Sequence, residues 1–316
     1  MSSLRSRAKS SRTLRTSVFL AQNALEALRS RGLPAAADAS AARYELAAMI
    51  RVKDEARFLP EWLAHHIGLG VEHVVVYDNN SSDGTQDLID PFVREGLVTH
   101  VPWPTVPASP SCHVDFFARF GPSCRWAAFF DADEFLVENA PGALAATLDR
   151  TEAPAIAVNM RYFGSAGHEV IPEGLVTERF DRADATGDRH VKVIARPAEF
   201  VAYRNSHNFY YRRGRLGRTP EGRRVFGSFV PPATRPALAL NHYVYRSRED
   251  YERRAKPQHG YVDASGAREQ RRRFDRAETE FHRHNDVVAP VPEAVRKATA
   301  DLLQRLGYPE ELYRPS

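Results

Sequence analysis

Residues 126–137, W-A-A-F-F-D-A-D-E-F-L-V, indicate the fold of this chain most directly. The first five are apolar and predict a buried strand, because the run is short, continuous and rich in aromatic side chains. If this strand continues to Asp133, the side chains of Asp131 and Asp133 project from one face and that of Glu134 from the other, since strand side chains alternate. Ligands of open α/β sheets bind beyond the carboxyl ends of the strands, where the two aspartates are expected.

The two aspartates are candidate metal ligands. Close carboxylates repel each other, and a divalent cation between them relieves the repulsion. Mg²⁺ or Mn²⁺ is typically held by one or two carboxylates and completed by water and phosphate oxygens. The alternative is a pair of solvated loop acids that cap the next turn. The buried approach to Asp131 and the motifs elsewhere in the chain favour the metal.

The chain before residue 126 alternates predicted strands and helices. Strands are expected at residues 46–52, 71–77 and 97–101, and helices at 59–67, 86–94 and 113–120. This order predicts right-handed crossovers and a parallel sheet. The fold class expected is therefore α/β, with a central, mostly parallel mixed sheet flanked by helices.

The turn after the second predicted strand, D-N-N-S-S-D-G-T, consists almost wholly of turn and cap residues. Its Asp78, Asn79 and Asp83 could bind ribose hydroxyls and the polar edge of a base, while its backbone N–H groups face phosphate. Glu55, after the first strand, would line the same crevice. The chain has no G-x-G-x-x-G, so a dinucleotide site lacks its main sequence support.

The second half of the chain is predicted to continue with mixed elements. A flexible polar turn is expected at 163–169 and an exposed hairpin or mobile loop at 212–224. Strands are expected at 155–162, 175–180, 191–195, 208–211 and 237–245, and helices at 142–148, 248–254, 268–284 and 292–306.

The composition of the 316 residues, with 43% apolar and 27% charged, is typical of a soluble enzyme. No run of 18 apolar residues exists, and no signal-peptide core is evident. We therefore expect a cytoplasmic protein, or one at the inner face of the membrane. Cys112 and Cys124 are too few for a disulfide framework or a zinc site, and we expect buried free thiols.

Positive charge is concentrated at the N-terminus. Residues 1–43 carry eight basic and two acidic side chains, and the remaining residues have a net charge of −2. Such an arm, rich in Ser, Arg and Ala, is expected to be disordered. It could contact anionic lipid, but it lacks the interleaved aromatic residues of a nucleic-acid-binding surface, so no nucleic-acid partner is expected.

The ordered set of motifs resembles the GT-A glycosyltransferases, and most closely their family 92 and family 2-like group. The resemblance covers about residues 45–262. Its motifs are R-V-K-D-E at 51–55, Y-D-N-N-S-S-D-G-T at 77–85, D-A-D-E-F at 131–135, F-G-S-A-G-H-E at 163–169, V-T-E-R-F at 176–180, H-V-K-V-I-A-R-P at 190–197, S-H-N-F at 206–209 and N-H-Y-V-Y-R-S-R-E-D-Y at 241–251. This implies a GT-A domain at 44–262 and a C-terminal helical extension at 263–316.

The resemblance also implies roles for individual residues. Asp131 and Asp133 match the D-x-D motif, with Asp133 the direct ligand of Mn²⁺ or Mg²⁺ and Asp131 the ribose or water-mediated contact. His242 matches a further metal or diphosphate ligand. Lys192 and Arg254 match groups that offset diphosphate charge. The residues that match the nucleoside-contacting set are Glu55, Asp78, Asn79 and Asp83.

The activity implied is metal-dependent transfer of a sugar from a UDP- or GDP-sugar to a glycan, glycolipid or other hydroxyl acceptor, with inversion. Inverting transfer requires one positioned carboxylate or histidine to take the acceptor proton. Glu169 and Glu178, on segments expected to face the acceptor, are the candidates. Glu134 is disfavoured because strand alternation points it away from the metal face.

Two other readings stay open. The D-A-D-E segment could serve a metal-dependent phosphotransferase or phosphatase, although a haloacid-dehalogenase-like enzyme would place D-x-D-x-T on its first strand, and Phe135 stands where that threonine would be. Alternatively, the chain could be an inert module that binds nucleotide or glycan without turnover.

Overall fold

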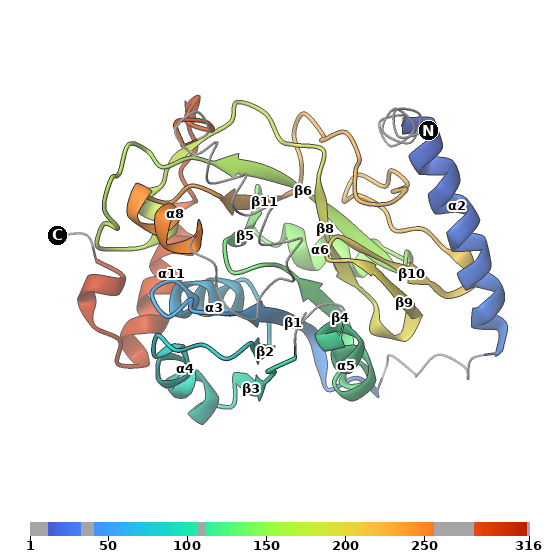
Figure 1. Ribbon diagram of the computed structural model, residues 1–316, viewed down its shortest axis with the longest axis horizontal. Helices are drawn as coiled ribbons and strands as arrows, with labels where there is room; N and C mark the ends of the chain where they lie inside the picture. The colour runs from blue at the N-terminus through green and yellow to red at the C-terminus, as the bar shows by residue number, and fades with distance from the viewer. Residues whose placement is uncertain (1–11, 33–40, 106–110, 256–280, 315–316) are drawn as a thin grey trace.

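The computed structural model describes residues 12–32, 41–105, 111–255 and 281–314. These residues form a ten-stranded mixed sheet with helices packed against it (Figure 1). The predicted α/β class is confirmed.

The N-terminal half is a parallel sheet with the order β3-β2-β1-β4. All of its strand pairs are parallel, and helices connect them as the alternating pattern predicts. The elements are β1 (Tyr44–Val52), α3 (Leu59–Gly68), β2 (His73–Asp78), α4 (Thr85–Arg94), β3 (Val98–Pro102), α5 (Ser111–Arg119), η3 (Gly121–Ser123) and β4 (Cys124–Phe129).

The C-terminal half adds mostly antiparallel pairs beside β4. β8 pairs with β4 and β6, and β11 joins β6 to β5. The elements are β5 (Glu134–Glu138), α6 (Ala143–Arg150), β6 (Ala155–Phe163), α7 (Val176–Arg179), β7 (Arg182–Ala183), β8 (Val191–Ala195), η4 (Pro197–Glu199), β9 (Phe200–Asn205), β10 (Asn208–Tyr211), η5 (Arg212–Gly214), β11 (Leu238–Tyr243), α8 (Arg248–Ala255), β12 (Val287–Val288), α11 (Glu293–Arg305) and η6 (Glu310–Leu312).

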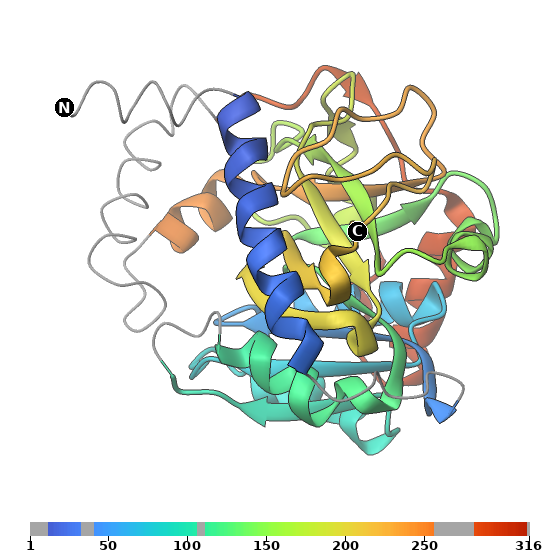
Figure 2. The same ribbon diagram turned by 90° about the vertical axis from the view of Figure 1, so that its right-hand side faces the viewer.

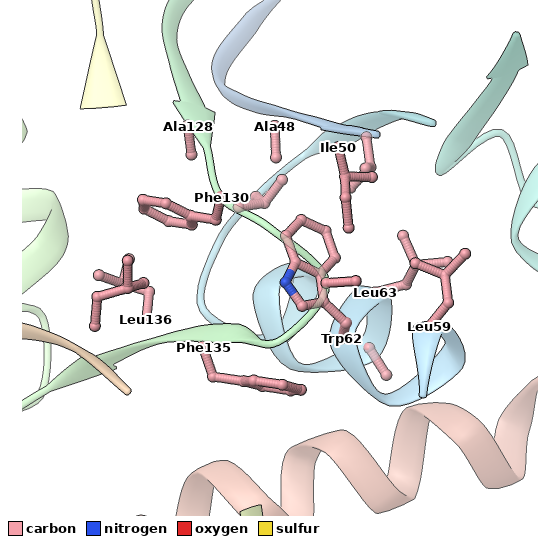
Figure 3. Close-up of a cluster of buried hydrophobic side chains, with 14 of the residues drawn as sticks. Ala48, Ile50, Leu59, Trp62, Leu63, Ala128, Phe130, Phe135 and Leu136 are labelled. Carbon is pink, nitrogen blue, oxygen red and sulfur yellow. The ribbon is translucent and has the colours of Figure 1, made fainter. Parts of the chain in front are cut away.

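The core lies on both faces of the sheet, which explains the continuous apolar runs in the sequence. Along β1, Ala48 and Ile50 belong to one buried cluster, whereas Ala47 and Met49 belong to the other. Helix α3 covers the first face. Its Trp62 lies among the side chains of that cluster (Figure 3).

Helix α3 also fixes the turn between β4 and β5. The indole N–H of Trp62 donates to the backbone oxygens of Asp131 and Glu134, at 3.0 and 2.8 Å. His65 Nε2 donates to Leu136 O at 2.7 Å, and His66 Nε2 accepts from Leu136 N at 3.2 Å. The helix therefore holds the acidic turn from its buried side.

The strand predicted at 175–180 is wrong, because residues 176–179 form helix α7. The buried carboxylate of Glu61 accepts hydrogen bonds from Val176 N at 2.6 Å and Thr177 N at 3.0 Å. A carboxylate at the first backbone N–H groups of a segment stabilises a helix start. Since Glu61 belongs to α3, the local sequence of 175–180 does not reveal this partner.

The prediction of a disordered N-terminal arm is also wrong for part of the arm. Residues Arg12–Arg29 form helix α2, followed by η1 (Ser30–Gly32), and α2 runs along the outside of β10 (Figure 2). Phe19 is buried and stacks on Tyr210, and Asn23 donates to Gly214 O at 2.8 Å. These long-range contacts supply the stabilisation that the arm's own composition does not.

Other expectations also differ from the structure. Residues 212–224 begin with η5, and Arg218 forms isolated bridges with Ile156 and Arg224 rather than a free hairpin. Strands β5 and β9 were not predicted. The helix expected at 268–284 lies mostly outside the described residues. Helix α11 packs against α3, while the proposed division into domains stays a prediction.

Candidate active site

The acidic turn has a different geometry from the one that strand alternation predicts. β4 ends at Phe129, so the strand does not continue to Asp133. Glu134 begins β5, is 1% exposed, and accepts a hydrogen bond from Asp131 N at 2.8 Å. The expectation that Glu134 points away from Asp131 is therefore wrong, because a turn separates the two strands and resets the alternation.

Lys192 on β8 is the cation at the centre of the turn. It is 1% exposed, and its Nζ lies 2.6 Å from Asp131 Oδ2 and 3.3 Å from Glu134 Oε2. Burial alone would lower the pKa of Lys192, but the two carboxylates outweigh it and hold that pKa above its usual value. The residue predicted to offset diphosphate charge thus already neutralises protein carboxylates.

The two carboxylates differ in their electrostatics. Burial would raise the pKa of Asp131, but Lys192 and Arg51 prevail and lower it, so Asp131 is ionised. Burial raises the pKa of Glu134 to about 7, against the attraction of Lys192. The half-exposed Asp131 is therefore the more accessible anion of the pair.

Asp133 lies against His242 of β11, with Asp133 Oδ2 3.5 Å from His242 Nε2. Both side chains are about one-fifth exposed. Burial alone would lower the pKa of His242, but Asp133 outweighs it and raises that pKa. The Nδ1 atom of His242 is buried and makes no hydrogen bond with the described residues. The structure thus brings together two of the three predicted metal ligands, while Asp131 faces Lys192.

Within the described ranges, no group of three or more His, Cys, Asp or Glu residues is arranged to hold a metal. Asp133 and His242 nevertheless supply adjacent oxygen and nitrogen donors, and imidazole is an acceptable ligand of Mn²⁺. The nitrogen of His242 that faces Asp133 is Nε2, and both side chains keep about one-fifth of their surface exposed. These observations fit a divalent cation on Asp133 and His242, completed by ligands from outside the chain.

The predicted nucleotide-binding residues lie on the same edge of the sheet, where β1 and β2 end side by side. Asp78 is 7% exposed, and its Oδ1 accepts from Ser81 N at 2.9 Å. The amide of Asn79 donates to Trp103 O at 2.6 Å, while its buried Oδ1 has no described partner. A buried acceptor without a donor marks a place where a polar ligand could bind.

The carboxylate of Asp83 holds neighbouring loops together through hydrogen bonds. One of its carboxylate oxygens accepts from Ala56 N at 2.9 Å, and the other accepts from Thr85 N at 3.0 Å and from the Thr85 hydroxyl at 2.5 Å. Asp54 Oδ1 likewise accepts from Ser82 N at 2.7 Å. These bonds tie the loop after β1 to the loop after β2, so Asp83 shapes the crevice. Its predicted nucleoside contact stays a prediction.

Arg246 is not among the site residues predicted from the sequence, although it stands four residues after His242. It is fully buried, its Nε is 2.9 Å from Asp250 Oδ2, and its Nη2 is 3.4 Å from Glu55 Oε2. Its Nη1 has no hydrogen-bond partner among the described residues. Asp133 is among the carboxylates that raise the pKa of Arg246, after burial, which alone would lower it. Arg246 therefore joins Glu55 to the region of Asp133.

The two predicted bases, Glu169 and Glu178, pair with arginines instead. Arg248 Nε lies 2.7 Å from Glu169 Oε2, and the Glu169 side chain is 62% exposed. Arg296 of α11 lies 3.0 Å from Glu178. Arg254 belongs to α8, but its side chain lies outside the described residues. The roles predicted for these residues stay predictions.

A histidine–aspartate pair precedes β8, the strand that carries Lys192. His190 stands two residues before Lys192, and its Nδ1 is 2.5 Å from Asp188 Oδ1. The Tyr162 hydroxyl is 3.5 Å from the same nitrogen, and the Tyr162 ring is 5.2 Å from that of His242. A row of side chains thus connects Asp133 and His242 to His190. The H-x-K spacing of His190 and Lys192 was the sequence signal for this arrangement, because residues i and i+2 of a strand project from the same face.

The sequence matches the model of one protein family, described as glycosyltransferase family 92, over residues 48–212. The match covers more than half of the chain. The chain belongs to glycosyltransferase family 92. The predicted family is therefore confirmed.

Relatives within family 92 include plant proteins. One from Ricinus communis is 31% identical over 219 residues, covering 65% of this chain and 36% of the relative. Another, from Arabidopsis thaliana, is 28% identical over 190 residues, covering 55% and 33%. This family 92 chain thus spans about a third of the length of these relatives. The crystal structure of S. aureus TarS matches 85% of this chain and 50% of its own, with 15% identity and a TM-score of 0.35.

Proposed function

We propose that this family 92 chain is a metal-dependent glycosyltransferase that moves a sugar, with inversion, from a UDP- or GDP-sugar to a hydroxyl of a glycan or glycolipid. The observation that carries the proposal is the meeting of three loops at one sheet edge. These loops follow the parallel strands β1, β2 and β4, and the last of them presents Asp131 and Asp133. Ligands of α/β sheets bind at this edge.

Asp133 and His242 are the residues that would hold Mn²⁺ or Mg²⁺, since they lie 3.5 Å apart and remain partly exposed. When bound, such a cation would stabilise the negative charge that develops on the leaving diphosphate. Lys192 keeps Asp131 ionised and in place. Asp131 can then bind a ribose hydroxyl or a metal-bound water, as the resemblance implies.

Asn79 and Asp78 are the proposed contacts of the nucleoside, and the unsatisfied Oδ1 of Asn79 supports this role. Glu55 lies on the adjacent loop, with its carboxylate directed at Arg246. Asp83 contributes indirectly, because its hydrogen bonds fix the two loops relative to each other.

His190 is the base that the geometry supports best. Its Nδ1–H is directed at Asp188, and in this tautomer Nε2 carries a lone pair. An acidic partner that fixes the tautomer of a histidine base is a recurring catalytic arrangement. In the transfer step, the acceptor oxygen bonds to the anomeric carbon, the bond from that carbon to the diphosphate breaks, and the acceptor proton passes to Nε2. Glu169 and Glu178 remain alternatives that would first have to leave Arg248 and Arg296.

The test is turnover of a panel of UDP- and GDP-sugars by the full chain, with Mn²⁺ or with EDTA. Release of UDP or GDP that requires both Mn²⁺ and an acceptor, with an inverted product configuration by NMR, is expected. Release of inorganic phosphate instead would favour a phosphatase. Metal-dependent nucleotide binding without release of any product would favour an inert binding module.

A further inference from the structure

Helix α2 has an apolar face that no described residue covers. Between residues 18 and 28, six of the seven exposed residues are apolar: Val18, Leu20, Ala21, Ala24, Leu25 and Leu28, the seventh being Gln22. The four large ones are 44–57% exposed, and they make up four of the nine exposed large apolar side chains in the described part of the chain. Single exposed apolar residues are ordinary, but such a concentration on one helix marks an interaction surface.

This face is opposite to the one that docks on the domain. Phe19, Asn23 and Ser30 are buried against the domain, through Tyr210 and the segment around Gly214. Val18, Ala21, Leu25 and Leu28 recur at spacings of three and four, which places them in one stripe along the helix. The docking contacts therefore leave the exposed stripe on the side of α2 that faces away from the domain. Figure 2 shows α2 on the outside of the molecule.

The charge of the N-terminal sequence identifies the occupant. Residues 1–43 carry eight basic side chains and two acidic ones. Arg29 follows the stripe with its side chain 65% exposed, and it pairs with Glu26 at 2.7 Å. A second copy of the chain would bring the same positive charge against itself, whereas an anionic lipid surface would neutralise it. An outward apolar face in a segment with an excess of arginine is the pattern of helices that lie in the membrane interface.

A groove beside the helix fits the same occupant. It has a volume of about 760 Å³ and is lined on one side by Leu20, Ala24 and Leu28. Arg31 and Arg213 also line it. Apolar walls suit an acyl chain, and guanidinium groups bind phosphate well.

We propose that α2 docks this protein onto the surface of an anionic phospholipid bilayer, with its apolar stripe in the interface. The helix lies on the bilayer: among the described helices, none is both long and apolar enough to span one. This inference is independent of sugar transfer.

The test is flotation of the full chain with vesicles of phosphatidylcholine, with and without phosphatidylglycerol. Binding is expected only to the vesicles that contain phosphatidylglycerol, and it should weaken at high salt. The double variant Leu25→Gln/Leu28→Gln should bind more weakly by about tenfold or more, because two apolar side chains no longer enter the interface.

A matched pair of single variants controls for general loss of apolar surface. Val18 of α2 and Val114 of α5 are each 48% exposed. Val18→Gln should weaken vesicle binding, whereas Val114→Gln should not, and circular dichroism should show unchanged helix content in both. Equal binding to neutral vesicles, or none to either kind, would overturn the proposal. So would a dimer in light scattering that the double variant dissociates, since a second copy would then cover the stripe.

Discussion

Removal of the Lys192 ammonium should destabilise the whole fold. Lys192 and Glu134 are each 1% exposed, and 3.3 Å separates their charged groups. In Lys192→Met the apolar stem is kept, but Glu134 loses its buried counter-ion. Breaking such a pair costs about 3–5 kcal/mol. We expect the lower end, about 3 kcal/mol, because Glu134 can take up a proton instead of remaining charged.

The assay is urea unfolding followed by circular dichroism. The double variant Lys192→Met/Glu134→Gln should recover part of the lost free energy of unfolding, since glutamine can still accept a hydrogen bond from Asp131 N. The coupling free energy between the two substitutions should be about 2 kcal/mol. The control is Lys297→Met, which removes an ion pair to Asp301 at 2.7 Å whose side chains are 71% and 59% exposed. That change should cost less than about 1 kcal/mol. If Lys192→Met costs no more than Lys297→Met, or if the two changes at the site are additive, the buried-pair reasoning is refuted.

Three further predictions concern the buried His65 and Glu61 and the partly exposed His190. Burial lowers the pKa of His65 from 6.5 to about 4, so the unfolded chain binds the proton more readily. Stability should fall as the pH drops from about 6.5 to about 4, by on the order of 3 kcal/mol, and urea midpoints of His65→Gln should depend less on pH. Glu61→Ala should destabilise the fold by about 2–4 kcal/mol, because Val176 N and Thr177 N lose their buried acceptor, and a wild-type unfolding midpoint would contradict this. His190→Gln should lower kcat by about 10²–10⁴ while nucleotide affinity by calorimetry is unchanged. Undiminished kcat would exclude His190 as the base.

The parallel half of the sheet could be predicted from the sequence because its signals are local. β1, β2 and β4 are continuous apolar runs followed by polar turns, and their burial on both faces matches that pattern. The aspartates after β4 could be placed at the ligand-binding edge for the same reason. In the structure Asp133 and His242 lie together, although more than 100 residues separate them in the chain.

The rest of the site depends on contacts between distant segments, which local patterns do not encode. The turn after β4 is held by Trp62 of α3, so alternation misplaced Glu134. Helix α7 depends on Glu61, and helix α2 on Tyr210. The pairing of His190 with Asp188 is local, but the approach of Tyr162 to both His190 and His242 is a contact between distant segments.

The central claim is a metal-dependent nucleotide site at the edge formed by β1, β2 and β4. Isothermal titration of the full chain with UDP and with GDP, each with and without Mn²⁺, tests it most directly. We predict that one nucleotide binds only with Mn²⁺. Asp133→Ala and His242→Ala should each abolish this Mn²⁺-dependent binding, while leaving the unfolding midpoint near that of the wild type. Binding of neither nucleotide under any condition, or metal-dependent binding that survives both substitutions, would contradict the claim.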